Sequence, residues 1–254
     1  MPSLFVESIK DDINLAKIDQ ELTEYAKRTD NANVIVTVYD DALIYVIDII
    51  KKHNVKFIEL LGSHGQRDEA LLFNLVRYLQ KQNIKVLYKQ PAPDYHLIPY
   101  LDAVCLKGIE AAGSIASNLV GSLDDVVQTF MRNYTVPVIA TGGIATKERI
   151  DELLGKGVMA VGIGTLFAAS AESKLLPKAK EELIKHNNSE IYGNRRYIKL
   201  SDYNEPDDKN MSNSLKQGIT GIGGHIYAGA GISEIREVLS VSAIVKRLTD
   251  SLYQ

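Results

Sequence analysis

The sequence has little that could form a disulfide or a cysteine-based metal site. Its single cysteine, Cys105, cannot make an internal disulfide, and its five histidines are scattered without ligand spacing. A single cysteine is typical of a reducing compartment, so we expect a cytoplasmic protein. The acidic run from Asp202 to Asp208 is interpreted as a solvated loop, because it lacks the glycine spacing of a calcium loop. The sequence therefore predicts no metal site.

Charge of one sign and long apolar runs are also missing. The chain has 29 basic and 32 acidic residues, mixed along its length, for a net charge of −3. This balance argues against a nucleic-acid-binding surface. No run of about 18 apolar residues occurs, and the N-terminal MPSLFVESIKDDINL is unlike a cationic leader followed by an apolar stretch. We therefore expect a soluble protein without a membrane partner.

What is present fits one α/β domain. The chain has 254 residues, of which 45% are hydrophobic and 24% charged. This length and composition are normal for a single α/β barrel. The prediction is one domain over residues 1–254, with a polar excursion at about 170–217.

Short β-branched runs alternate with longer amphipathic segments, which is typical of βα units and a parallel sheet. The predicted strands are LFVES (4–8), NVIVTVY (33–39), VKFIELL (55–61), IKVLYK (84–89), DAVCLK (102–107), VPVIAT (136–141) and MAVGIG (159–164). Apolar residues three and four apart between them predict helices that face the sheet, as in Leu43, Val46, Ile47 and Ile50 or in Leu72, Leu75, Val76 and Leu79.

This pattern predicts a TIM-barrel-like (β/α)₈ fold with about seven parallel strands. A closed barrel normally has eight, so three alternatives stay open: the first strand is absent, one strand is unrecognised, or the sheet is open. After Ala168 we expect a charged helix, ESKLLPKAKEELIKHN, a polar stretch at 187–213, a glycine-rich segment at 218–231, and a final amphipathic helix, SEIREVLSVSAIVKRLTDSL.

Two glycine turns are the most informative feature. Gly142 and Gly143 follow one predicted strand, and Gly164 and Thr165 follow the next. The last two βα loops of a barrel commonly bind phosphate, because small residues let backbone N–H groups approach an anion. The alternative is that these glycines only permit tight turns. Two such turns in succession favour phosphate binding.

The blocks DAVCLKGIEAAGS and PVIATGGIATKERIDELLGKGVMAVGIGTLF resemble the nitronate monooxygenase (2-nitropropane dioxygenase-like) family of FMN-dependent TIM barrels, which includes type II enoyl-acyl carrier protein reductases. The resemblance runs from about residue 33 to the end. It implies that Gly142, Gly143, Gly164 and Thr165 bind the phosphate of FMN. It also implies that Lys89 lies near the flavin ring and that a turn passes the flavin. The residues of that turn are Glu110, Ala111, Ala112 and Gly113.

Three departures from the family pattern fall on the same face. Ser114 occupies the position of the family's histidine, and a hydroxyl cannot accept a proton at neutral pH as imidazole does. Thr37 occupies the position of an asparagine. The family's opening strand, with its Pro-Met turn, has no counterpart, because LFVES resembles the second strand. Ala112 also replaces a glycine of the turn beside the flavin.

Two histidines could supply the missing base. His225, in TGIGGHIYAG, lies in the segment that the family folds toward the pocket, and the alternative is a histidine of a surface loop. His64 follows a predicted strand, at the end where barrel active sites form. The candidate catalytic residues are therefore Ser114, as a hydrogen-bond donor, and His225, as a base.

Three functions remain open at this stage. The first is an FMN-dependent oxidoreductase that acts on a small-molecule substrate. The second is a degenerate barrel that binds a flavin or a phosphate ligand without catalysis. The third is a part of a larger assembly, in which another copy or a partner chain supplies the missing strand, because open sheet edges pair readily.

Overall fold

The computed structural model describes residues 3–5, 13–39, 42–62, 69–89, 96–115, 121–200 and 211–250. The chain divides into two compact units. Unit 1 comprises Met1–Cys105 and Tyr134–Pro137, and unit 2 comprises Leu106–Asn133 and Val138–Gln254. The single domain expected over residues 1–254 stays a prediction.

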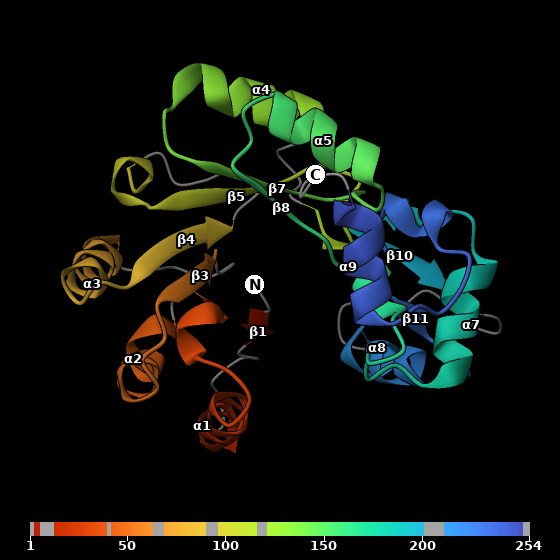
Figure 1. The fold of residues 1–254 in the computed structure, drawn as a ribbon, viewed down its shortest axis with the longest axis horizontal. Coiled ribbons are helices and arrows are strands. Elements are labelled where there is room, and N and C mark those ends of the chain that lie inside the picture. Colours follow the sequence, from red (N-terminus) through yellow and green to blue (C-terminus); the bar gives the residue numbers. More distant parts are fainter. Residues whose placement is uncertain are drawn as a thin grey trace. The chain divides into compact units, whose positions relative to one another are not determined.

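Unit 1 consists of parallel strands joined by helices (Figure 1). Its strands are β1 (Ser3–Phe5), β2 (Ile35–Tyr39), β3 (Phe57–Leu61), β4 (Lys85–Lys89) and β5 (Ala103–Lys107), the last of which continues into unit 2. Its helices are α1 (Ile13–Ala26), α2 (Leu43–Lys52) and α3 (Glu69–Lys81), with short 3₁₀ turns η1 (Asn31–Asn33) and η3 (Ile98–Tyr100). In Figure 1 the helices α1 to α3 lie along one side of strands β2 to β4.

The core of unit 1 explains why the sequence alternates as it does. Helix α2 buries Leu43, Val46 and Ile50, and α3 buries Leu72, Val76 and Leu79. These are most of the apolar positions that the helical spacing predicts. The middle residues of β2, β3 and β4 are buried on both faces, as strands of a parallel sheet covered by helices are. Burial of these side chains is the main stabilising term in this unit.

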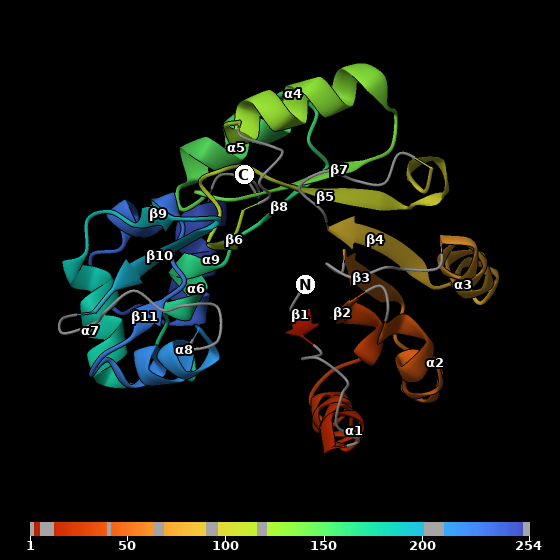
Figure 2. The same cartoon turned by 180° about the vertical axis from the view of Figure 1, so that it is seen from behind.

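Unit 2 combines a parallel pair of strands with a small antiparallel sheet (Figure 2). Its strands are β6 (Gly113–Ser114), β7 (Val138–Thr141), β8 (Ala160–Gly162), β9 (Glu190–Tyr192), β10 (Arg195–Lys199) and β11 (His225–Ile226). Its helices are α4 (Leu123–Asn133), α5 (Lys147–Gly155), α6 (Thr165–Ala168), α7 (Pro177–Lys185), α8 (Met211–Thr220) and α9 (Val241–Thr249), with the 3₁₀ segment η4 (Ala230–Glu234).

The seven predicted strands all occur. They follow one another as β1-β2-β3-β4-β5-β7-β8, and each pair with a defined register is parallel. This order confirms the predicted α/β class with about seven parallel strands. The carboxyl ends of such strands carry the loops that form active sites in barrels, and both glycine turns follow strands of this series.

The polar excursion is more ordered than its composition indicates. The polar stretch at 187–213 contains β9 and β10, and β10 pairs with β9, β6 and β11. The acidic run from Asp202 to Asp208 lies outside the described residues. The charged helix is α7, which begins at Pro177, where a proline suits the first turn.

The final helix is shorter than predicted. The sequence pattern places its start near Ser233, but α9 begins at Val241, where Ser240 accepts a hydrogen bond from the N–H of Ala243 at 3.1 Å. Residues 230–234 form the 3₁₀ segment η4 instead. The first half of this prediction is therefore wrong, because Ser240 provides a stronger start signal than the apolar spacing before it.

Candidate functional site

The turn after β7 requires its glycines. Gly142 has φ +119° and Gly143 has φ +67°. A Cβ atom at Gly142 would lie 2.9 Å from both Cβ and N of Ala111, and one at Gly143 would lie 2.8 Å from Cβ of Glu110. Positive φ and close approach both exclude larger side chains here. The two turns predicted to contact flavin, 110–113 and 142–143, are thus in direct contact.

The turn after β8 differs from the first. Gly164 has an ordinary φ of −111°, and a Cβ at this position would meet no atom within 4 Å. Thr165 begins α6, and its Oγ1 accepts a hydrogen bond from the N–H of Gly229 at 2.9 Å. Because a hydroxyl can accept and donate at once, its proton remains able to reach a further acceptor.

A segment near the C-terminus joins these turns. The N–H of Ala230 donates to the carbonyl of Glu110 at 2.8 Å. A Cβ at Gly229 would lie 2.7 Å from the carbonyl oxygen of Glu110, and one at Gly231 would lie 2.9 Å from Cβ of Ala145. Together with the bond from Gly229 to Thr165, these contacts place residues 229–231 against all three predicted turns of unit 2.

Sequence reasoning did not single out Gly229 and Gly231 as site residues. The available signal was the small-residue run AGAG at 228–231, which allows close backbone approach. The N–H groups of Gly142, Gly143 and Gly164 make no hydrogen bond to another residue in the described part of the chain. These donors, together with the hydroxyl of Thr165, fit the requirements of a phosphate group.

Glu110 stabilises the neighbouring helix. Its Oε2 accepts a hydrogen bond at 3.0 Å from the N–H of Leu123, the first residue of α4. The turn is closed by a bond from the N–H of Ala111 to the carbonyl of Gly108 at 3.1 Å. A carboxylate at a helix N-terminus satisfies an otherwise unpaired N–H and interacts favourably with the helix dipole. The side chain of Glu110 therefore joins the turn to α4, and its backbone carbonyl accepts the hydrogen bond from Ala230.

Ser114 and Gly113 form the short strand β6. Ser114 is exposed, and its carbonyl accepts a hydrogen bond from Nζ of Lys107 at 2.8 Å. The same ammonium lies 3.4 Å from the carbonyl of Ala112. Gly113 has φ +73°, and a Cβ there would lie 3.5 Å from the ring of Tyr227. The hydroxyl of Ser114 is thus presented on the surface of unit 2, next to the predicted flavin turn.

His225 is fully buried, so its alternative assignment to a surface loop is wrong. Its Nδ1 lies 2.7 Å from Oγ of Ser214, and its ring packs between those of Tyr197 and Tyr227 at centroid distances of 4.7 and 5.1 Å. Desolvation, aided by the nearby charge of Arg195, lowers the pKa of His225 to about 4. The ring is therefore neutral at neutral pH, and its burial favours a packing role. His64, the other candidate base, lies outside the described residues.

In unit 1, Lys89 ends β4 beside a buried acid. Its Nζ lies 3.5 Å from Oε2 of Glu59, which also accepts a hydrogen bond from the hydroxyl of Thr37 at 3.1 Å. Burial alone would lower the pKa of Lys89, but Cys105 and Glu59 outweigh it and the pKa is raised. Lys89 therefore stays cationic. The threonine found in place of the family's asparagine is paired to this acid.

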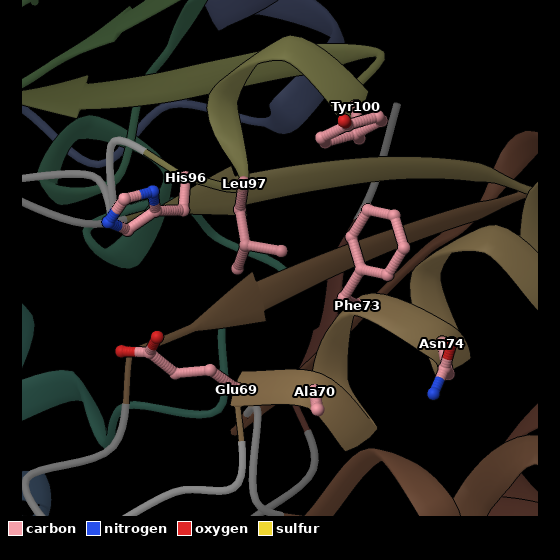
Figure 3. A pocket seen from close by; sticks show the side chains of 7 residues that line it. All are labelled: Glu69, Ala70, Phe73, Asn74, His96, Leu97 and Tyr100. Atoms are coloured by element: carbon pink, nitrogen blue, oxygen red, sulfur yellow. The ribbon is translucent and has the colours of Figure 1, made fainter.

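A separate pocket of about 350 Å³ lies in unit 1 (Figure 3). It is lined by residues from the start of α3 and from the segment before and within η3, namely Glu69, Ala70, Phe73, Asn74, His96, Leu97 and Tyr100. Figure 3 shows Glu69 and His96 on one side of it, and Phe73 and Tyr100 on the other. These two rings meet edge to face at 4.8 Å. No site residue predicted from the sequence lines it.

Within the described ranges, no three or more His, Cys, Asp or Glu side chains are grouped so as to hold a metal ion. No helix there combines the length and the apolar character needed to cross a membrane.

Comparisons with known proteins place these features in a family context. Residues 97–197, which contain the Glu110 turn, both glycine turns, β9 and the first part of β10, match the family model described as nitronate monooxygenase. No curated protein sequence matches the chain.

Several solved structures share the fold. FabK from Thermotoga maritima is 19% identical, with a TM-score of 0.78 over 97% of this chain and 83% of that one. Nitroalkane oxidase from Streptomyces ansochromogenes is 18% identical, with a TM-score of 0.72 over 94% and 85%. The enoyl reductase domain of MlnA from Bacillus amyloliquefaciens is 14% identical, with a TM-score of 0.54 over 82% and 64%. The fold is therefore TIM-barrel-like, and together with the match over residues 97–197 it confirms the resemblance of this chain to the nitronate monooxygenase-like family.

Proposed function

We propose that this protein is an FMN-dependent oxidoreductase, and that unit 2 holds the phosphate of FMN. The observation that carries the proposal is the convergence of the Gly142–Gly143 turn and Thr165 on one segment, residues 229–231. The N–H groups of Gly142, Gly143 and Gly164 make no hydrogen bond within the described chain, and such donors are what a phosphate requires. The match of residues 97–197 to the nitronate monooxygenase family supports the same assignment.

The residues of this site have distinct tasks. The N–H groups of Gly142, Gly143 and Gly164 donate to phosphate oxygens, and the hydroxyl of Thr165 donates its proton while it accepts from Gly229. The turn from Glu110 to Gly113 borders the ligand, held in place by the bonds to Leu123 and Ala230. FMN, when bound, supplies the electron transfer, and the protein supplies binding and orientation.

The acid–base part of the chemistry differs from that implied by the family histidine. Ser114 is exposed and donates a hydrogen bond to the ligand, but its hydroxyl is not a base at neutral pH. His225 is fully buried with Nδ1 at Ser214, so a catalytic role for it requires that the Tyr197 and Tyr227 rings give access to the imidazole. This difference favours substrates whose reaction does not need a strong base.

The phosphate assignment is tested by titrating the protein into FMN and following the flavin fluorescence. Thr165→Val removes one hydrogen bond to a charged group, so we expect the affinity to fall about tenfold or more. Thr165→Ser keeps the hydroxyl and should bind FMN almost as the unchanged protein does. Equal affinity of the valine variant and the unchanged protein, at comparable thermal stability, would remove Thr165 from the site.

A degenerate binding barrel is the second candidate, favoured by Ser114 at the position of the family's histidine and by the burial of His225. The two candidates differ in one measurement. If the protein is an oxidoreductase, the visible absorbance of its bound FMN should fall when NADH or NADPH is added in the absence of oxygen, because the flavin is reduced. A flavin that stays oxidised with both donors, and that dithionite still reduces, supports the binding module.

A further inference from the structure

The hairpin formed by β9 and β10 is attached to the turn that the proposed ligand borders. Strand β10 pairs antiparallel with β6, with Arg195 opposite Ser114 and Arg196 opposite Gly113. The N–H of Ile115 extends this pairing by donating to the carbonyl of Asn194 at 2.7 Å. The excursion is thus hydrogen-bonded to the strand that follows the Glu110 turn.

One side chain of the hairpin reaches the turn itself. Nε of Arg196 donates to the carbonyl of Ile109 at 2.8 Å. Its Nη1 donates to the carbonyl of Ser189 at 2.6 Å and to the hydroxyl of the same serine at 3.3 Å. The planar guanidinium holds several acceptors in a fixed geometry, which lysine cannot do. Arg196 therefore links Ser189, which directly precedes β9, to Ile109, which directly precedes Glu110.

The charge of Arg196 is incompletely balanced. Burial lowers its pKa, and the carboxylate that opposes this effect is that of Glu110, whose Oε2 is already hydrogen-bonded to Leu123. In the described part of the chain, no carboxylate lies within ion-pair distance of Arg196. The hydrogen-bond partners of this half-buried guanidinium are carbonyl and hydroxyl groups. Arg196 therefore places a positive charge beside the Ile109–Glu110 turn, and a positive charge attracts anionic ligands.

The Ile109–Glu110 turn also contacts the Gly142–Gly143 turn and residue 230. Ile109 precedes Glu110, whose Cβ approaches Gly143 so closely that a Cβ there would lie 2.8 Å away. The carbonyl of Glu110 accepts the N–H of Ala230. The Ile109–Glu110 turn is therefore in contact with both the Gly142–Gly143 turn and residue 230.

We propose that Arg196 is a positioning residue for the phosphate-bearing ligand, and that the β9–β10 hairpin serves to hold the Ile109–Glu110 turn against the Gly142–Gly143 turn. The ligand class is a phosphate monoester, for which the guanidinium provides a favourable field. This inference rests on the proposed function, since it assumes that the ligand lies at these turns.

The test combines FMN affinity with amide hydrogen exchange of the unliganded protein. In Arg196→Gln we expect the FMN dissociation constant to rise about tenfold, and the amides of Ala111 and Ala230 to exchange faster, with those of α5 unchanged. Arg196→Lys keeps the positive charge but lacks the planar guanidinium with its fixed donors, so its affinity for FMN should lie between those of Arg196→Gln and the unchanged protein. The control is Arg236→Gln, because Arg236 is exposed and makes one 3.4 Å contact with Asn187; it should bind FMN normally.

Two results would overturn the proposal. One is an Arg196→Gln variant with normal FMN affinity and normal exchange at Ala111 and Ala230. The other is a loss of affinity accompanied by faster exchange throughout unit 2, which marks a general loss of stability. Failure of the unchanged protein to bind FMN is a different outcome. It refutes the proposed function itself, and with it the role of Arg196 toward that ligand.

Discussion

At the scale of single residues, the glycines of the two turns are not equivalent. Gly142 combines φ +119° with atoms of Ala111 only 2.9 Å from where a Cβ would lie, whereas Gly164 has an ordinary φ and open space around it. Both follow a strand of the parallel series. The glycine spacing alone predicts two turns, but it does not reveal which turn is strained, because that depends on the Glu110 turn from a distant part of the sequence.

This difference predicts unequal losses of stability for the same substitution at the two positions. Gly142→Ala should destabilise the protein by about 2 kcal/mol or more, because alanine is strained at this φ and its Cβ meets backbone atoms. Gly164→Ala should cost less than about 1 kcal/mol, the ordinary loss at a helix N-cap. Urea denaturation of the two variants measures both values. Equal costs would mean that the contact between residues 111 and 142 is not as described.

His225 makes stability depend on pH. Its pKa is about 4 in the folded state, against 6.5 for an ordinary histidine. Between these values the unfolded chain binds more protons, so stability is fully present above pH 6.5 and is lost as the pH falls toward 4. The loss amounts to at most about 1.4 kcal/mol for each pH unit.

The measurement is urea denaturation of the unchanged protein and of His225→Gln at several pH values from neutral down to the folded-state pKa. Glutamine does not titrate, so the variant should lose less stability over this range than the unchanged protein. Parallel pH profiles of the two proteins would show that the buried imidazole does not resist protonation.

At the scale of secondary-structure elements, the strands of the parallel sheet are well predicted from the sequence and those of the excursion are not. Strands β2, β3 and β4 are buried on both faces and appear in the sequence as continuous apolar runs. Strand β10 has the sequence RRYIK, in which only Tyr197 and Ile198 are buried. Its identity as a strand comes from pairing with β6, β9 and β11, which the local sequence does not encode.

The sequence likewise predicts only part of the candidate site, because some of its contacts are not encoded locally. The residues at strand ends, such as Gly143 and Thr165, follow from the alternation of strands and helices. The contacts of Gly229 and Arg196 with the Glu110 turn join residues far apart in the sequence, and no local pattern indicates them. The sequence places Glu110 in a turn of the candidate site, but it does not predict the hydrogen bond between its carboxylate and the first residue of α4.

The bond between Glu110 and α4 predicts a stability effect separate from ligand binding. Glu110→Ala removes the acceptor for the N–H of Leu123, so it should destabilise the unliganded protein by about 1 kcal/mol, as the loss of a helix cap does. Glu181→Ala, on the exposed side of α7, is the control and should stay within about 0.5 kcal/mol. Thermal denaturation without FMN compares the two. A Glu110 variant as stable as the control would show that the carboxylate does not cap α4.

At the scale of the whole molecule, the order of seven parallel strands and the match of residues 97–197 agree with the resemblance read from the sequence. The two turns proposed to bind phosphate, Ser114 and the β9–β10 hairpin all belong to unit 2, and Lys89 with Glu59 and Thr37 belongs to unit 1. The fold alone does not establish function, because one fold hosts many activities. The proposed activity therefore depends on whether the protein binds FMN.

Retention of FMN can be measured from the visible absorption spectrum of the freshly purified protein, recorded before and after addition of FMN. We expect flavin absorption bands in the purified protein, or a shift of the bands of added FMN that saturates at one FMN per chain. A colourless protein that leaves the spectrum of added FMN unchanged would show that the chain does not bind FMN.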